Sequence, residues 1–203
     1  YDVSDVAAND TVGNLSVSGQ VVGAQNSDTK LIASGNLEID GAVSNDGKML
    51  LNANSVSLAS IANTGFASSL EIKSLLDATG LINISGNIVN TNGMVSISAK
   101  DVSVGGEIIN NGGVLTLLGS DSNGGAVQLQ ALDIQAGQVD LNALAGAVTF
   151  SGALTVAGGN LSLGSSLYDL TVNNAPVQIL GSLVSGQQVA GQGNVTVAAT
   201  GTQ

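Results

Sequence analysis

One short phrase recurs along the chain, and a recurring phrase restricts the possible folds more strongly than any average property does. The phrase is a run of alternating apolar and polar residues that ends in a small residue. Its clear copies are NLSVSG, NLEIDG, SVSLAS, LINISG and DVSVGG, which begin at residues 14, 36, 55, 81 and 101. Weaker copies are ALDIQA, AVTFSG, DLTVNN and NVTVAA, which begin at residues 131, 147, 169 and 194. The phrase therefore returns about every 22 residues, which is a repeat length typical of solenoids.

A second alternating run lies inside most of the repeats. Its copies are KLIASG, KMLLNA, MVSISA, VLTLLG, AVQLQA, QVDLNA and NLSLGS, which begin at residues 30, 48, 94, 114, 126, 138 and 160. Alternation with period two is typical of a strand with one buried face. Turn sequences such as Asn-Asp-Gly and Asn-Asn-Gly-Gly separate the strands. We interpret the one helix-like stretch, SLLDATG at 74–80, as a loop that bulges from one coil.

A single coil buries too few aliphatic side chains to offset the entropy lost when its backbone is ordered. Neighbouring coils must therefore share a core and pair their strands. We predict an all-β parallel β-helix of about nine coils that forms one domain over residues 1–203, with the best-formed repeats at 31–118 and looser repeats at 126–203. An antiparallel sandwich is the alternative. It does not require one phrase to recur at matching positions, and it usually contains more aromatic residues than the 2% found here.

Coils stacked in register place equivalent residues in columns. A small residue after the first strand allows the chain to turn without a clash at Cβ, and we expect this role for Gly19, Gly41, Gly86, Gly106 and Gly152. An apolar residue two places before each asparagine should form a stacked core column, made of Val43, Ile61, Ile88 and Ile108. The asparagines themselves should form a hydrogen-bonded ladder at one corner, made of Asn45, Asn63, Asn90 and Asn110. The alternative is a row of asparagines that binds a polar ligand.

The residues that usually perform catalysis are scarce. The chain has no histidine and no cysteine, which removes the common general bases, catalytic triads and zinc sites. A polysaccharide hydrolase would need clustered carboxylates, and the candidates Asp40 and Asp101 belong to distant coils. We therefore expect no enzyme, no cofactor and no metal site. Calcium binding by the acidic turn GSDSNGG at 119–125, around Asp121, is weighed against an ordinary turn, and the turn is favoured.

The charge balance restricts the partners. Fifteen acidic residues stand against Lys30, Lys48, Lys73 and Lys100, for a net charge of −11. Nucleic acids and anionic lipids are therefore unfavourable partners, and no apolar run reaches the ~18 residues that span a bilayer. The absence of cysteine is compatible with secretion from a bacterium. Because the sequence starts at Tyr1, we expect either that a signal was removed or that the chain is a piece of a longer protein.

The stretch LIASGNLEIDGAVSNDGKMLLNANSVSLASIANTG, which begins at residue 31, resembles the repeat of the filamentous haemagglutinin family of bacterial exoproteins. The resemblance is close over 31–118 and looser over 126–203. It implies a right-handed parallel β-helix, secretion that often uses an outer-membrane partner, and long extracellular or surface fibres for adhesion and biofilm. The N-terminal secretion domain of that family is not recognisable in this sequence.

Two functions of different classes remain. The first is a structural module that stacks head to tail on copies of itself or on flanking solenoid segments to make a bacterial surface fibre. The second is an adhesin module that binds cell-surface or matrix glycans, which would need a local cluster of aromatic, arginine or extended loop residues. The aromatic residues Phe66, Phe150, Tyr1 and Tyr168 are scattered, and we expect Phe66 and Phe150 in the core. We therefore favour the structural module, with a polysaccharide-degrading enzyme as a distant third.

Overall fold

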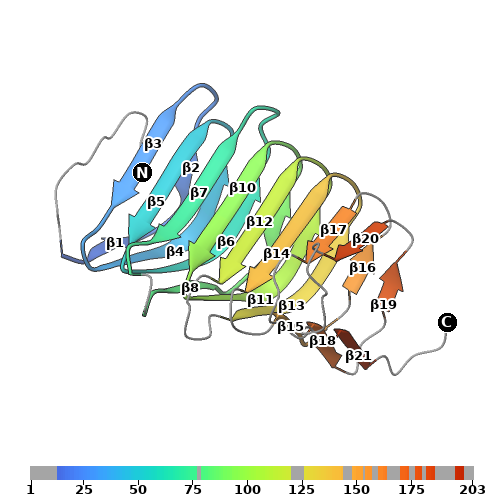
Figure 1. The fold of residues 1–203 in the computed structure, drawn as a ribbon. Helices are drawn as coiled ribbons and strands as arrows, with labels where there is room; N and C mark the ends of the chain where they lie inside the picture. The colour runs from blue at the N-terminus through green and yellow to red at the C-terminus, as the bar shows by residue number, and fades with distance from the viewer. Residues whose placement is uncertain are drawn as a thin grey trace.

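The computed structural model of the protein describes residues 13–76, 79–119, 126–143 and 148–152, followed by short strands between residues 154 and 198. Within these residues the chain forms strands and turns and contains no helix. The strands form two sheets that run along an elongated stack, as Figure 1 shows. Both sheets are built by the same rule, in which each coil adds its strands beside those of the coil before it.

The larger sheet has 13 strands. Its main path joins β1 (Leu15–Val17), β4 (Asn36–Asn45), β6 (Ser55–Asn63), β8 (Leu81–Ile84), β11 (Asp101–Asn110), β13 (Val127–Ile134), β15 (Val148–Phe150), β18 (Leu170–Asn173) and β21 (Val195–Ala198). Four short strands pair beside this path, namely β2 (Val21–Gly23), β9 (Ile88–Asn90), β16 (Leu154–Val156) and β19 (Val177–Ile179).

The smaller sheet has eight strands, which lie side by side at the front of Figure 1. In chain order they are β3 (Asp28–Ile32), β5 (Lys48–Ala53), β7 (Ser69–Ser74), β10 (Met94–Ala99), β12 (Val114–Gly119), β14 (Gln138–Ala143), β17 (Asn160–Leu163) and β20 (Ser182–Ser185). Every strand pairing in the two sheets is parallel. The prediction of an all-β parallel solenoid is confirmed, and the antiparallel sandwich is excluded.

Each coil has three walls, because the larger sheet is divided by a break in register. The break lies between Ile39 and Ala42 in β4 and between Val104 and Glu107 in β11. The first wall consists of the strand segments before this break, and the second wall consists of those after it. The third wall is the eight-stranded sheet. One coil therefore runs through the first, second and third walls before the next coil begins.

The number of coils differs from the prediction of about nine. About six turns are described at length, from β1 to β14. The main path of the larger sheet continues through β15, β18 and β21, but only short strands are described there. The helix-like stretch at 74–80 begins at the last residue of β7 and continues into the connection to β8, and its described residues, 74–76 and 79–80, are not helical.

Two strand assignments made from the sequence are wrong. The run from residue 131 was predicted as a copy of the first strand, and the run from residue 126 as a copy of the second. In the structure Val127 pairs with Val102 on the first wall, and Leu132 pairs with Ile108 on the second wall. Both runs belong to β13, because two alternating hexapeptides with the same period cannot be assigned to a wall from their pattern alone.

The strands of the third wall also differ in part from those predicted from the sequence. β7 and β20 were not predicted as strands. The run from residue 30 was aligned with the run from residue 48, whereas Lys48 pairs with Asp28. A shift of two residues leaves the same side chains pointing inward, so the hydrophobic pattern does not detect it.

The interior is filled by columns of aliphatic side chains. On the second wall the predicted column of Val43, Ile61, Ile88 and Ile108 pairs in direct register from coil to coil, and Leu132 continues it. These side chains are all buried. The first wall adds Leu37, Val56, Ile82, Val102 and Val127, and the third wall adds Leu51, Ile72, Ile97, Leu117 and Leu141. A narrow core of this kind is built without buried aromatic anchors among the residues whose burial is described.

The predicted turn glycines lie where the backbones of successive coils approach closely. A Cβ on Gly86 would lie 2.7 Å from the carbonyl oxygen of Ala59, and a Cβ on Gly106 would lie 2.6 Å from that of Gly86. Gly41 lies against Gly19 in the same manner, and Gly152 lies against Gln130. Only Gly19 of this set has a positive φ, of 108°. Close stacking, rather than turn geometry, therefore requires glycine at most of these positions.

We predict that Gly106→Ala destabilises the protein by about 1–3 kcal/mol, because its Cβ would contact main-chain atoms that cannot move without shifting the neighbouring coil. Gly13→Ala is the matched control, since a Cβ there meets nothing within 4 Å. Urea unfolding followed by circular dichroism measures both variants. Equal unfolding midpoints for the two variants would contradict the close stacking of Gly106 on Gly86.

Candidate functional site

The four predicted asparagines lie inside the protein at one corner of the solenoid. Each one ends a second-wall strand, and they pair in register as Asn45 with Asn63, Asn63 with Asn90, and Asn90 with Asn110. All four have an exposed fraction of 0%. A polar side chain in such a place must be hydrogen-bonded, because a buried unpaired polar group is costly.

The asparagine side chains form a ladder along the solenoid. The Nδ2 of Asn45 donates to Oδ1 of Asn63 at 2.9 Å, and that of Asn63 donates to Oδ1 of Asn90 at 2.9 Å. The Nδ2 of Asn90 then donates to Oδ1 of Asn110 at 2.8 Å. Every donor points toward the coil that follows in the chain. The ladder therefore has one direction along the whole column.

The same amide groups also hold the turns that lead into the third wall. We name this corner the turn edge, and it comprises residues 24–27, 46–47, 64–68, 91–93, 111–113 and 135–137. Each Nδ2 also donates to a turn carbonyl, with distances of 3.0 Å from Asn45 to Gly47, 3.0 Å from Asn63 to Asn92, 3.0 Å from Asn90 to Gly112 and 2.7 Å from Asn110 to Ala136. The ladder thus links the register of the interior to the shape of the turns. The amide groups of its asparagines donate to other atoms of the protein.

The asparagine column changes character at both ends. In the first coil Gly23 pairs with Asn45, and a Cβ on Gly23 would lie 2.6 Å from Oδ1 of Asn45. At the other end Asn110 pairs with Ile134, and Val156 follows Ile134. The polar column is thus continued by aliphatic residues. This change coincides with the loss of the Asn-x-Gly turn from the sequence after residue 126.

Three further glycines of the turn edge were not singled out by the sequence analysis, which noted the Asn-Asn-Gly-Gly turn that Gly113 ends. Gly93, Gly113 and Gly137 have φ values of 78°, 72° and 79°, which L side chains rarely adopt. Each one immediately precedes a third-wall strand. The carbonyls of Gly93 and Gly113 accept from the next coil, Gly93 O from Val114 N at 2.9 Å and Gly113 O from Gln138 N at 2.8 Å. A glycine three residues after each of Asn90, Asn110 and Ile134 is the signal that could have found them.

The structure does not bring together the two carboxylates that were considered for catalysis. Asp40 and Asp101 belong to β4 and β11, which are separated on the main path by β6 and β8. Three strand spacings of ~4.8 Å put the two strands about 14 Å apart. Asp101 has a local partner instead, because its Oδ1 accepts from Ala126 N at 2.9 Å.

Among the residues described, no group of three or more acidic side chains is placed to hold a metal ion. Asp121 and the turn around it lie outside the described residues. No helix in the described part of the chain is long and apolar enough to cross a membrane.

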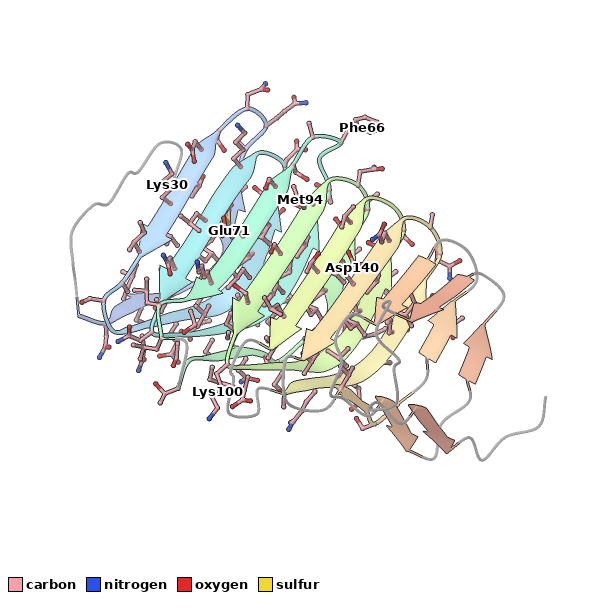
Figure 2. All side chains as sticks on the ribbon, viewed as in Figure 1. Lys30, Phe66, Glu71, Met94, Lys100 and Asp140 are labelled. Atoms are coloured by element: carbon pink, nitrogen blue, oxygen red, sulfur yellow. The ribbon has the colours of Figure 1, made fainter. Side chains whose placement is uncertain are left out.

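The expectation that Phe66 is a core residue is wrong. Its side chain is 89% exposed, and Figure 2 shows it projecting from the turn edge. Phe66 lies in the connection between β6 and β7, where the chain has already left the second wall. The sequence analysis counted an apolar residue near the repeat as interior without knowing the loop length. The side chains of Phe150, Tyr1 and Tyr168 lie outside the described residues.

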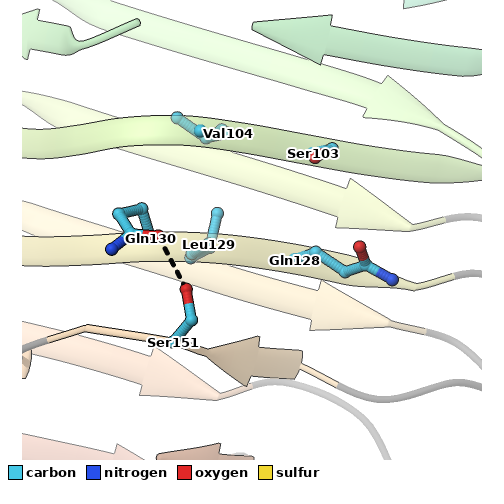
Figure 3. Close-up of a pocket in the computed structure, with 7 residues that line it drawn as sticks. Ser103, Val104, Gln128, Leu129, Gln130 and Ser151 are labelled. Carbon is cyan, nitrogen blue, oxygen red and sulfur yellow. Dashed lines mark hydrogen bonds between the residues drawn. The ribbon is translucent and has the colours of Figure 1, made fainter. Parts of the chain in front are cut away.

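A shallow hollow of about 270 Å³ lies on the outer face of the first wall, where β11, β13 and the end of β15 meet (Figure 3). The lining residues are Ser103, Val104, Gly105, Gln128, Leu129, Gln130 and Ser151. The Oγ of Ser151 donates to Oε1 of Gln130, which belongs to the preceding coil, at 2.8 Å. Its side chains are neutral, so hydrogen bonding is the interaction that this surface offers.

Comparisons of the chain with protein-family models, curated proteins and solved structures return no match. The architecture is therefore established by the strand pairings, and the resemblance to filamentous haemagglutinin repeats rests on the repeated phrase itself.

We predict that Asn90→Ala lowers the free energy of unfolding by roughly 3 kcal/mol or more. The variant loses the bond from Asn63 and leaves Oδ1 of Asn110 and the carbonyl of Gly112 without this donor, and each buried unsatisfied group costs about 1–3 kcal/mol. Asn111→Ala, an exposed neighbour on the turn edge, is the control. The midpoint of urea unfolding reports both, and a midpoint for Asn90→Ala within error of the control would refute the ladder as a stabilising element.

Proposed function

We propose that the protein is a non-enzymatic, secreted structural β-solenoid that forms or extends an extracellular bacterial surface fibre by head-to-tail stacking. The observation that supports this most directly is that successive coils repeat one contact pattern. Three walls of parallel strands join each coil to the next, and the asparagine ladder adds side-chain bonds in the same register from Asn45 to Asn110. A pattern that repeats by translation is suited to length and stiffness.

Head-to-tail growth uses the bonds that already operate within the chain. A parallel strand presents N–H and C=O groups along both of its edges, so a coil offers the same donors and acceptors to a second copy that it offers to its own neighbour. A contact of this kind, repeated without closing a ring, gives an open fibre. Each coil adds about 4.8 Å to the length.

The alternating faces of the strands support a single register at such a junction. A slip of one residue would exchange the inward and outward faces of every strand. The asparagine ladder fixes the register inside each copy, from Asn45 to Asn110, and is continued by Gly23 and by Ile134 at its two ends. A fibre built in this way would gain a uniform register within each copy from the asparagines, and cohesion from the aliphatic columns.

The proposal of an extracellular setting rests on the sequence rather than on the site. The repeat resembles that of secreted bacterial exoproteins, the chain contains no cysteine, and its net charge of −11 favours solubility over binding to anionic surfaces. Within the resemblance, fibres of this type act in adhesion and in the biofilm matrix. We propose a role of this kind, in adhesion or in the biofilm matrix, for this protein.

Electron microscopy of the purified 203-residue chain tests the proposal. We expect filaments whose width is that of one solenoid, and fibre diffraction with a repeat of about 4.8 Å along the filament axis. Short rods of uniform length would reject self-stacking of this chain and leave it as a segment of a longer rod. Compact globular particles would contradict both forms of the proposal.

A further inference from the structure

The turn edge is uneven over the first three coils. Four residues connect β2 to β3 (24–27), two connect β4 to β5 (46–47), and five connect β6 to β7 (64–68). The middle turn is therefore lower than the loops on either side. A hollow of about 480 Å³ lies over it, within the range usual for small-ligand sites. We name it the saddle, and its lining residues include Asn26, Asp28, Asp46, Lys48 and Phe66.

The walls of the saddle are held in place by hydrogen bonds. On one side the Oγ of Ser27 donates to the carbonyl of Ala24 at 2.6 Å. On the other side the buried Ser68 donates from Oγ to the carbonyl of Gly65 at 2.7 Å. The floor is tied to the asparagine ladder, because Nδ2 of Asn45 donates to Gly47 O. Loops fixed in this way lose little conformational entropy when a ligand binds.

Phe66 places an aromatic ring in water at the rim of the saddle. It is the most exposed large apolar side chain of those described, at 89%, and the next is Met94 at 50%. Both faces of an aromatic ring at such exposure are open to a flat apolar surface, and covering it would remove that surface from water. The saddle therefore combines the apolar ring of Phe66 with a group of polar side chains.

The polar groups of the saddle restrict the class of ligand. Asp28 and Asp46 only accept hydrogen bonds, Lys48 only donates them, and the amide of Asn26 does both. The two carboxylates disfavour an anion. Lys48 disfavours a cation, and Asp28 is already paired with Lys30 at 3.3 Å. Hydroxyl groups both donate and accept, so a neutral polyhydroxyl ligand matches this mixture.

We propose that the saddle is a binding site for a neutral saccharide, in which Phe66 stacks on the apolar C–H face of a sugar ring and Asp46, Lys48 and Asn26 bind its hydroxyl groups. The site lies on the side of the solenoid and does not depend on whether the chain forms fibres. A solenoid with such a site would carry a sugar contact along its length, at one defined place on the turn edge.

Saturation-transfer difference NMR tests the proposal, because it observes the ligand and works on single chains and filaments alike. The probes are the methyl glycosides of glucose, galactose, mannose and N-acetylglucosamine. We expect at least one to receive saturation, mainly on ring C–H protons. Phe66→Ala should weaken its binding by about tenfold or more, and Asp46→Asn should weaken it as well because an anionic acceptor is lost.

Met94→Ala is the matched control, since it removes an exposed apolar side chain that does not line the saddle. It should bind the glycoside as the unaltered chain does, and all variants should unfold at the same urea concentration. Failure of all four glycosides to bind would overturn the proposal. Binding that is unchanged in Phe66→Ala would also overturn it, as would binding of tetramethylammonium or methyl phosphate in place of the glycosides.

Discussion

Each strand of this protein must find its hydrogen-bonding partners in the coil above and the coil below, and this requirement organises everything else. The backbone donors and acceptors of a parallel strand point sideways along the stack, so a coil is satisfied only when the next coil lies over it in register. The aliphatic columns follow from that register, as do the glycines at which two backbones meet. The asparagine ladder adds a second set of bonds in the same direction, buried where water cannot replace them.

The turn edge shows how the repeat combines regular and irregular parts. From β9 to β14, three residues separate the second wall from the third in each coil, and a glycine of positive φ ends each turn, at Gly93, Gly113 and Gly137. In the first three coils the turn length varies instead, and the saddle results from that variation. The ladder continues across this boundary, because Asn63 belongs to the irregular part and Asn90 to the regular part. Differences in the turns therefore leave the core unchanged.

Much of the fold could be predicted from the sequence because a solenoid repeats its constraints. The alternation of strands, the column led by Val43 and the asparagine repeat are all visible as equal residues at nearly equal intervals. The assignment of individual strands to walls was less accessible. Residues 126 to 136 contain two alternating hexapeptides, and only the pairing of Val127 with Val102 shows that both lie on β13. Phe66 was misjudged for a related reason, since its environment depends on the length of its loop and not on its own hydrophobicity.

Spin-label distances along one column of the third wall test the central claim of in-register parallel stacking most directly. Lys30, Leu50, Glu71, Ser96, Thr116 and Asp140 follow one another in register on the outer face, and Figure 2 labels three of them. The chain has no native cysteine, so labels can be introduced in pairs that share Lys30. Dipolar line broadening for the shorter pairs, and double electron–electron resonance for the longer ones, should give distances that grow by about 4.8 Å for each coil, reaching about 24 Å for the pair with Asp140. Distances that do not increase steadily with the number of intervening coils would contradict the stacking.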